Sequence, residues 1–436
     1  MNKKSKVITA AAVMTSVLAL TACGSSTTGN QGAPAGGGAN KTADAKKSVE
    51  IFSWWTGGGE EEGLKALIQL FKKQNPDVNV INAAVAGGAG TNAQAVLASR
   101  MQAGDPPDTF QVHAGAELLD SWVKAGKMQP LNDLYKEAGW TDKFPKSLVD
   151  MMSKDGKIYS VAVDIHRGNV LWINKKIFDD NHLKPPTTFD EFFKDADILK
   201  AKGITPLALG DKEPWTATML FEDVLLGELG PQGYDDLTQG KIKWDDPKVK
   251  QSLEIFKKML TYVNSDHAAR TWQDASQLVA KGQAAMNVMG DWAKGYFTSD
   301  LKLKPNVDFE WTTTPGTGSS FMVISDTFGL PKGIKHPEET KTFLKLLGSV
   351  EGQDAFNPLK GSIPARVDAD PSKYDVYSKQ AMADFKKDAL TPSIAHGSAM
   401  PQGFVTQMNQ AINIFVTQGD VNTAATTLEQ DAEQNK

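Results

Sequence analysis

Aromatic and hydrogen-bonding side chains follow two expected strands of this chain. Trp54 and Trp55 come at the end of the strand-like segment 49–54, and Gln111 and His113 come at the end of the segment 108–112. In layered α/β folds, ligands bind beyond the carboxyl ends of the strands. Adjacent strand residues point to opposite faces, so one tryptophan should pack on the sheet and the other should face a cleft. This placement is the first indication of a binding site.

Signatures of catalysis are absent from the sequence. There is no G-x-S-x-G elbow or H-E-x-x-H pair, and Ala86–Gly90 lacks the Lys-Ser/Thr of a phosphate-binding loop. A lone cysteine excludes an intramolecular disulfide and a multi-cysteine metal site. The formal net charge of -5 gives no basic excess for nucleic acid. We therefore expect no catalytic residue, no metal, no cofactor and no nucleic-acid partner.

The N-terminal residues have the pattern of an export signal. Lys3, Lys4 and Lys6 precede an uncharged apolar run over 7–20, which is too short to span a bilayer. The segment Leu20-Thr21-Ala22-Cys23 resembles the lipobox of bacterial lipoproteins, in which the cysteine thiol carries diacylglycerol. The alternative is an ordinary signal followed by a chance cysteine. We expect a signal peptide at 1–22, lipidation at Cys23, and a tether at 23–48 that has no large apolar side chain to bury.

Strand patterns alternate with helix patterns along the rest of the chain, which indicates an α/β layer fold with largely parallel pairing. The expected strands are 49–54, 78–85, 108–112, 169–173, 204–209, 284–290 and 321–330. The expected helices are 60–74, 93–102, 118–125, 131–138, 175–181, 189–201, 215–227, 247–263, 272–281, 292–298, 340–347, 350–357, 374–387 and 404–418.

Five segments, in order, are similar to segments of the family 1 extracellular solute-binding proteins of carbohydrate ABC transporters. They are 97–110, 172–178, 281–292 with its Gly-Gln-Ala-Ala-Met and Gly290-Asp291-Trp292, 329–333, and 361–365. Within that family, Trp54-Trp55, Gln111-x-His113, His166 and His396 most resemble the glucose- and galactose-type sugar-binding lipoproteins.

The resemblance implies a two-lobe periplasmic-binding-protein fold of type II, with mixed sheets flanked by helices and a ligand cleft between the lobes. We expect an N-terminal lobe at 49–160 and 326–360 and a C-terminal lobe at 161–325 and 361–436, with crossings near 160–164, 314–325 and 360–365. Hinge closure around a sugar would present the protein to a membrane permease. The expected protein is a monomer, is not an enzyme, and is lipid-anchored outside the cytoplasm.

A sugar offers apolar C–H faces and edges of hydroxyl groups, which call for aromatic plates and for polar acceptors and donors. We assign the plates to Trp54, Trp55, Trp272 and Trp292, the acceptors to Glu60, Asp291 and Asp326, and the donors to Gln111, His113, His166, Lys360 and His396, with Gly290 in the same motif as Trp292. Trp122, Trp172 and Trp244 are expected in the core, and Trp140 and Trp215 are left open. For Asp326 the alternative is a turn cap.

Two other function classes remain possible at this stage. A glycosidase needs only two carboxylates, and the chain has 52 acidic residues, although no pair stands out. A tethered adhesin or peptide-binding module would have a shallow surface and would not bind free sugars tightly.

Overall fold

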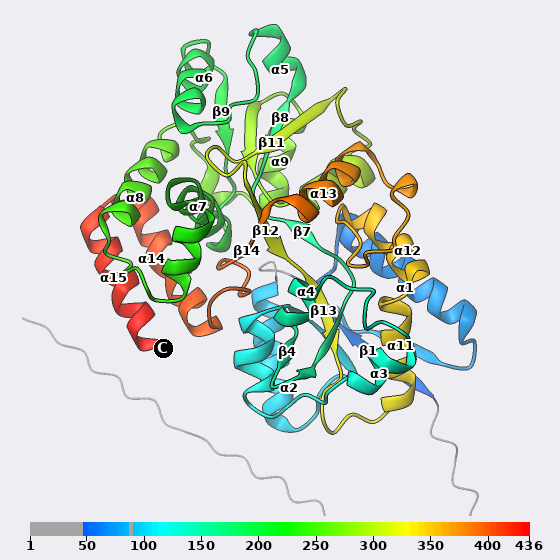
Figure 1. Cartoon of the computed structure of the whole chain (residues 1–436). Coiled ribbons are helices and arrows are strands. Elements are labelled where there is room, and N and C mark those ends of the chain that lie inside the picture. The colour runs from blue at the N-terminus through cyan, green and yellow to red at the C-terminus, as the bar shows by residue number, and fades with distance from the viewer. Residues whose placement is uncertain (1–46, 87–89) are drawn as a thin grey trace, which may run out of the picture. The chain divides into compact units, whose positions relative to one another are not determined.

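The computed structural model describes residues 47–86 and 90–436 (Figure 1). The predicted signal peptide, Cys23 and nearly all of the predicted tether lie outside the described residues. Within the described ranges, none of the helices has the length and apolar character needed to cross a membrane.

The first sheet has the strand order β2-β1-β3-β13-β6. Its strands are β1 (Ser48–Phe52), β2 (Asn79–Asn82), β3 (Thr109–His113), β13 (Asp326–Gly329) and β6 (Ser160–Ala162). Strand β1 pairs in parallel with β2 and β3, whereas β13 runs antiparallel to both β3 and β6. A strand from late in the chain is thus inserted next to β3.

The helices around this sheet follow the predicted apolar spacing. In α1 (Gly58–Gln74), Leu64, Leu67 and Phe71 are fully buried at positions i, i+3 and i+7, which gives one core-facing stripe. Helix α1 packs on α12 (Val350–Lys360) and α11 (Pro337–Leu347). Helix α2 spans Thr91–Ala103 and ends at Gly104.

The second sheet has the order β11-β8-β10-β9. Its strands are β8 (Val170–Asn174), β9 (Thr205–Ala208), β10 (Ala284–Val288) and β11 (Phe309–Thr313). β10 is parallel to β9 but antiparallel to β8, so the sheet is mixed and less parallel than the strand–helix alternation predicted.

Helices with clear caps surround the second sheet. Thr188 forms a capping box with Glu191 at the start of α6 (Phe189–Ala201), and Thr271 does the same with Asp274 for α9 (Trp272–Ala280). α7 (Trp215–Thr238) packs against α8 (Pro247–Leu260) and α14 (Gln402–Gln418), and α14 packs against α15 (Val421–Gln434) (Figure 1). Helix α7 is interrupted at Gly230, where φ is 66°, just before Pro231. The first part of α7 therefore ends close to residue 227, the predicted end of the helix.

A third sheet has the strand order β14-β12-β7. Two of its strands are next to strands of the first sheet along the chain, since β7 follows β6 and β12 precedes β13. The third sheet consists of β7 (His166–Arg167), β12 (Ser320–Ile324) and β14 (Ala389–Pro392). The prediction of one strand over 321–330 is wrong, because β12 and β13 belong to different sheets and only Ser325 separates them. The Ser325 hydroxyl donates to the Asp164 carbonyl at 2.6 Å, and the Asp326 N–H donates to Asp164 Oδ1 at 2.8 Å.

A further link between segments runs through Ile363. Helix α12 ends at Lys360 and is capped by Gly361, and Ile363 then forms a backbone bridge with Ile165, just after β6. The predicted helix at 118–125 is a π-helix, η2 (Glu117–Val123). The remaining elements are α3 (Asn132–Glu137), α4 (Lys146–Met151), β4 (Ser153–Lys154), β5 (Lys157–Ile158), α5 (Lys175–Asp180), η3 (His267–Ala269), α10 (Trp292–Gly295), η4 (Tyr296–Asp300), η5 (Pro371–Lys373) and α13 (Val376–Lys387).

Candidate ligand-binding site

A cavity of about 310 Å³ is lined by residues from the first and third sheets and from helices α1, α2, α7, α9, α10, α12 and α14. Trp54 and His113 reach it from the ends of β1 and β3, His166 from β7, and Asp326 from the start of β13. Lys360 enters at the last position of α12. The volume lies at the lower end of the range typical of small-molecule sites.

Aromatic rings form a continuous wall in this cavity. The Trp292 ring lies 5.1 Å from the His396 ring and 5.5 Å from the His166 ring, measured between centroids. Trp215 contacts both Trp292, at 6.1 Å, and His396, at 5.5 Å. His113 continues the wall, 5.7 Å from His396. The wall provides apolar ring faces for a flat ligand.

Trp54 and Trp55 lie on opposite sides of the backbone, as strand alternation predicted. Trp54 lines the cavity, 5.2 Å from the His113 ring. Trp55 is fully buried in the core, where its ring lies 4.7 Å from Phe356 and 5.5 Å from Phe328. Of the two, only Trp54 has access to a ligand.

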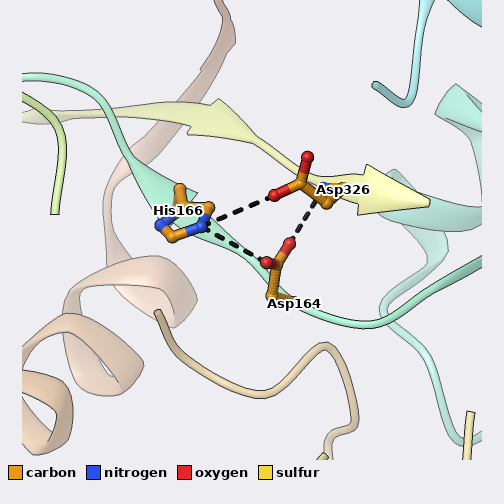
Figure 2. A group of neighbouring side chains, drawn as sticks. All are labelled: Asp164, His166 and Asp326. Carbon is orange, nitrogen blue, oxygen red and sulfur yellow. Dashed lines mark hydrogen bonds and ion pairs between the residues drawn. The ribbon is translucent and has the colours of Figure 1, made fainter. Parts of the chain in front are cut away.

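A buried charge network includes His166 and Asp326 of the cavity lining, and Figure 2 shows these two residues with Asp164. His166 Nε2 lies 3.2 Å from Asp164 Oδ2 and 3.7 Å from Asp326 Oδ2, and all three side chains are at most 5% exposed. On the other side of the ring, His166 Nδ1 makes a very short contact with Asp291 Oδ1. Asp291 Oδ2 also accepts from the Arg167 N–H and the Tyr377 hydroxyl, both at 3.1 Å.

These carboxylates keep His166 charged. Burial alone would lower the pKa of the His166 imidazole, but the Asp164 and Asp291 carboxylates outweigh that effect and raise the pKa to about 9. At neutral pH the ring is therefore an imidazolium. Its Nδ1 donates to Asp291, whereas Nε2 lies 3.2 Å from Asp164 Oδ2 but forms no hydrogen bond with the described residues.

Lys360 is a second buried cation of the site. Its ammonium lies 2.6 Å from Glu60 Oε1, and its side chain is 3% exposed. Burial alone would lower the pKa of Lys360, but Glu60, Asp326 and Asp164 outweigh that effect and raise it. The pKa of the Asp326 carboxyl is raised by burial and by the neighbouring Asp164 charge.

The Asp164–His166–Asp326 group is the one place in the described residues where three ligand-type side chains come close enough to hold a metal ion, with their atoms within 4.8 Å of one another. The protonated His166 and the Lys360 ammonium already supply two positive charges to these carboxylates. A metal ion would have to displace the proton from His166 Nε2 and approach these fixed charges. The local chemistry therefore favours a proton-balanced network over a metal site.

Two further histidines of the cavity have pKa values that are shifted in opposite directions. Burial would lower the pKa of His113, but Glu117, whose Oε2 is 2.6 Å from His113 Nδ1, outweighs it and raises the pKa. The pKa of His396 is lowered well below its usual value by burial and by the neighbouring His113, His166 and Lys360 charges, so this ring is neutral.

The tautomer of His396 follows from its neighbour. The Ser393 hydroxyl donates to Glu222 Oε2 at 3.0 Å, so it must accept from His396 Nδ1, also at 3.0 Å. Nε2 of His396 is then an acceptor, in contrast to the donor role predicted for this residue.

The structure brings together most of the residues that the sequence analysis named. Those that line the cavity are Trp54, Glu60, His113, His166, Trp272, Trp292, Asp326, Lys360 and His396. The turn-cap alternative for Asp326 is wrong, since Asp326 opens β13 and pairs with His113 across the sheet.

Four of the named residues lie behind the cavity lining: Trp55, Gln111, Gly290 and Asp291. Gln111 accepts from the Trp54 N–H at 3.1 Å and donates to Asp326 Oδ1 at 2.7 Å, so it fixes two lining residues. A Cβ at Gly290 would lie 2.3 Å from the Trp292 ring, so glycine is required for that ring to fold back.

Several lining residues were not named from the sequence. Trp215 had been left open, and Gln94, Glu213, Gln273, Gln402 and Asn409 had not been considered. On α14, Gln402, Val405 and Asn409 follow helical spacing, which was the available signal that one face of this helix is distinct.

The fold and the cavity define a class of protein that binds a small molecule between α/β lobes. The sequence profile of bacterial extracellular solute-binding proteins matches residues 57–354. An uncharacterized ABC transporter extracellular-binding protein of Pyrococcus horikoshii is 42% identical over 386 residues, which are 88% of this chain and 86% of that protein. A probable sugar-binding periplasmic protein of Brucella suis is 36% identical over 370 residues, 82% of this chain and 85% of that one.

The chain belongs to the family of bacterial extracellular solute-binding proteins. The resemblance inferred from the five sequence segments is thereby confirmed. The solved structure of the bacterial solute receptor AcbH has a TM-score of 0.79 and 21% sequence identity, and the match covers 89% of this chain and 98% of that one. This similarity confirms the two-lobe α/β fold with mixed sheets.

Proposed function

We propose that the cavity binds an uncharged sugar outside the cytoplasm and that the protein delivers it to an ABC-transporter permease. The observation that carries this proposal is the joining of an aromatic wall to buried charged donors and acceptors in one cavity. The name of the Brucella suis relative, a probable sugar-binding periplasmic protein, supports the same ligand class.

The charges of the site favour a neutral ligand. Lys360 is paired with Glu60, and His166 lies between Asp164 and Asp291. An anionic or cationic ligand would compete with these pairs and leave a buried charge uncompensated. Hydroxyl groups can instead donate to Asp326 and accept from Lys360 without breaking them.

The neutral His396 adds an acceptor to this set. Its Nε2 can take a hydrogen bond from a ligand hydroxyl, while Trp292 and Trp54 offer ring faces to the apolar C–H face of a pyranose. Three residues outside the cavity lining hold His166 and Asp326 in place. Asp291 accepts from His166, Gln111 donates to Asp326, and Asp164 accepts from the Asp326 N–H.

Lobe closure is the proposed means of signalling to the permease. The predicted lobe boundary at 160/161 is corrected to the end of β6, because Val161 and Ala162 pair with β13 in the first sheet. The proposed lobes are then 49–162 with 326–360 and 163–325 with 361–436. The single residue between β12 and β13 and the backbone bridge between Ile165 and Ile363 support hinge points there. Small φ/ψ changes in such short connections can rotate one lobe against the other.

Membrane attachment belongs to the same proposal. A signal peptide at 1–22 would be removed before Cys23. A lipid at Cys23 with a tether from 23 to 47 would hold a monomeric binding domain near the permease, since Ser48, the last residue of the predicted tether, belongs to β1.

Calorimetric titration against a panel of monosaccharides and disaccharides tests the ligand class. We expect one-to-one binding of at least one sugar with micromolar or tighter affinity and no release of reducing ends. Release of reducing sugar from a disaccharide would instead show a glycosidase. Failure of every sugar to bind would overturn the proposal and would favour the alternative of a tethered adhesin or peptide-binding module.

A further inference from the structure

A buried carboxylate holds the segment between β14 and α14 in place. Glu222, on α7, is fully buried and does not line the cavity. Its Oε2 accepts from the Ser393 hydroxyl at 3.0 Å and from the Ala395 N–H at 3.2 Å, and its Oε1 accepts from the Ile394 N–H and the Tyr234 hydroxyl. Burial raises the pKa of the Glu222 carboxyl, and these hydrogen bonds oppose that shift. Three of the donors belong to consecutive residues, so one side chain fixes the conformation of the whole segment.

Ser393 links Glu222 to the cavity. Ser393 Oγ accepts from the backbone N–H of His396 at 3.2 Å and lies 3.0 Å from His396 Nδ1. A hydroxyl group has only one hydrogen to donate, and that of Ser393 goes to Glu222. The proton of the neutral His396 ring must therefore be on Nδ1, and Nε2 is left as an acceptor without a partner among the described residues.

We propose that Glu222 is a positioning residue for ligand selectivity: through Ser393 it makes His396 Nε2 an acceptor only, so the ligand must donate a hydroxyl hydrogen there. The inference rests on the proposed function. Lys360 lines the same cavity and can only donate. A hydroxyl group can serve both kinds of partner, whereas a carbonyl oxygen, an ether oxygen or a fluorine atom cannot donate and would leave Nε2 unpaired.

Glu222→Gln tests this chain of hydrogen bonds because it keeps the shape of the side chain and adds a donor. Either placement of the amide NH₂ puts it next to a backbone N–H. We expect the NH₂ in place of Oε2, because the opposing N–H there, that of Ala395, is the more distant one. The amide then donates to Ser393 Oγ, the Ser393 hydroxyl turns to His396 Nδ1, and the ring proton moves to Nε2.

Nitrogen NMR spectra of the unliganded intact protein with isotope-labelled histidines measure this tautomer directly. We expect a protonated Nδ1 in the wild type and a protonated Nε2 in Glu222→Gln, and the signals that His396→Gln removes belong to this ring. Ser393→Ala removes the acceptor of Nδ1–H and should give the same reversal, which provides a second variant should Glu222→Gln fold poorly. Asp223→Asn is the matched control, since Asp223 is also buried on α7 but accepts from Thr314, and it should keep the wild-type tautomer.

Calorimetric titration connects the tautomer to ligand selectivity. The probes are glucose, galactose and the derivatives of each in which one hydroxyl is replaced by fluorine. In the wild type, fluorine at the position that faces Nε2 should weaken binding about five- to tenfold, because it leaves a buried acceptor unpaired. In Glu222→Gln the loss at that position should fall to about twofold or less, since Nε2–H then needs only an acceptor, and the losses at the other positions should not change.

Three results would overturn the role of Glu222 while leaving the sugar-binding proposal intact. They are a protonated Nε2 in the wild type, an unchanged tautomer in the folded variants, and fluorine penalties that are equal in the wild type and Glu222→Gln at every position. If no sugar binds, the proposed function fails, and the selectivity role of Glu222 fails with it.

Discussion

Replacing Asp326 by asparagine separates ligand binding from folding in one substitution. The change keeps the shape of the side chain and removes its charge. The amide oxygen can still accept from Gln111 Nε2, which now donates to Asp326 Oδ1 at 2.7 Å. What is lost is a buried carboxylate that lines the cavity and can accept from ligand hydroxyls.

The expected loss of affinity is large. A hydrogen bond to a charged group contributes about 1.5–3 kcal/mol, which corresponds to about a 10- to 150-fold weaker dissociation constant for the preferred sugar. The effect on the free protein has the opposite sign. Because burial and Asp164 raise the pKa of Asp326 in the folded state, its charged form is disfavoured there at neutral pH. A neutral asparagine should leave the melting temperature of the unliganded protein unchanged or higher.

The assay combines calorimetric titration with thermal unfolding of the unliganded protein at pH 7. Asp223→Asn is the matched control. Asp223 is also fully buried and its pKa is also raised by burial, but it accepts from Thr314 and does not line the cavity. We expect it to preserve affinity. Unchanged affinity together with a lowered melting temperature in Asp326→Asn would refute the role of Asp326 as a ligand acceptor.

Three further predictions concern closure, pH and the anchor. Gly115 has φ +107°, and a Cβ there would lie 2.1 Å from the Ser398 carbonyl oxygen. Gly115→Ala should therefore force these two segments apart. We expect sugar binding at least tenfold weaker and a larger radius of gyration in small-angle scattering. Gly333→Ala, also at positive φ but without a neighbour, is its control, and equal affinities in the two variants would contradict the reasoning. The pKa of His166 is about 9 in the folded protein and about 6.5 in the unfolded chain, so protonation of His166 contributes about 3 kcal/mol to the free energy of unfolding. This contribution is fully present below pH 6.5 and is lost as the pH rises through 9. Urea unfolding should show this decline in the wild type but not in His166→Gln, and parallel curves would argue against it. Cys23→Ser should keep sugar binding and release the protein from the membrane fraction, and full retention in membranes would show the anchor to be wrong.

Local patterns in the sequence were sufficient for the strand ends that carry the site. Trp54, His113 and Trp292 could be placed because each lies at or shortly after the end of a strand-like segment, and strand alternation separated Trp54 from Trp55. Helix α1 was predictable from the spacing of Leu64, Leu67 and Phe71 alone. In these cases the periodicity of the backbone determines which side chains share a face.

Features that depend on distant contacts could not be predicted in this way. The strand predicted over 321–330 contains the polar run Ser325-Asp326-Thr327, and the family resemblance implied a lobe boundary at 325/326. Its spacing does not show that Ser325 separates two strands of different sheets, because hydrogen bonds to Asp164, far away in the sequence, make that division. Likewise, the His396 tautomer depends on Glu222 through Ser393, and the position of Asp291 behind His166 depends on Tyr377 and Arg167. Spacing along the chain carries no information about such networks.

A structure determined with a bound sugar would show whether this cavity is the sugar-binding site. We expect a pyranose ring in the cavity with one face against Trp292 or Trp54 and with hydroxyl groups within hydrogen-bonding distance of Asp326 and Lys360. A sugar bound elsewhere on the surface, or a cavity that holds only water at saturating sugar concentration, would contradict it.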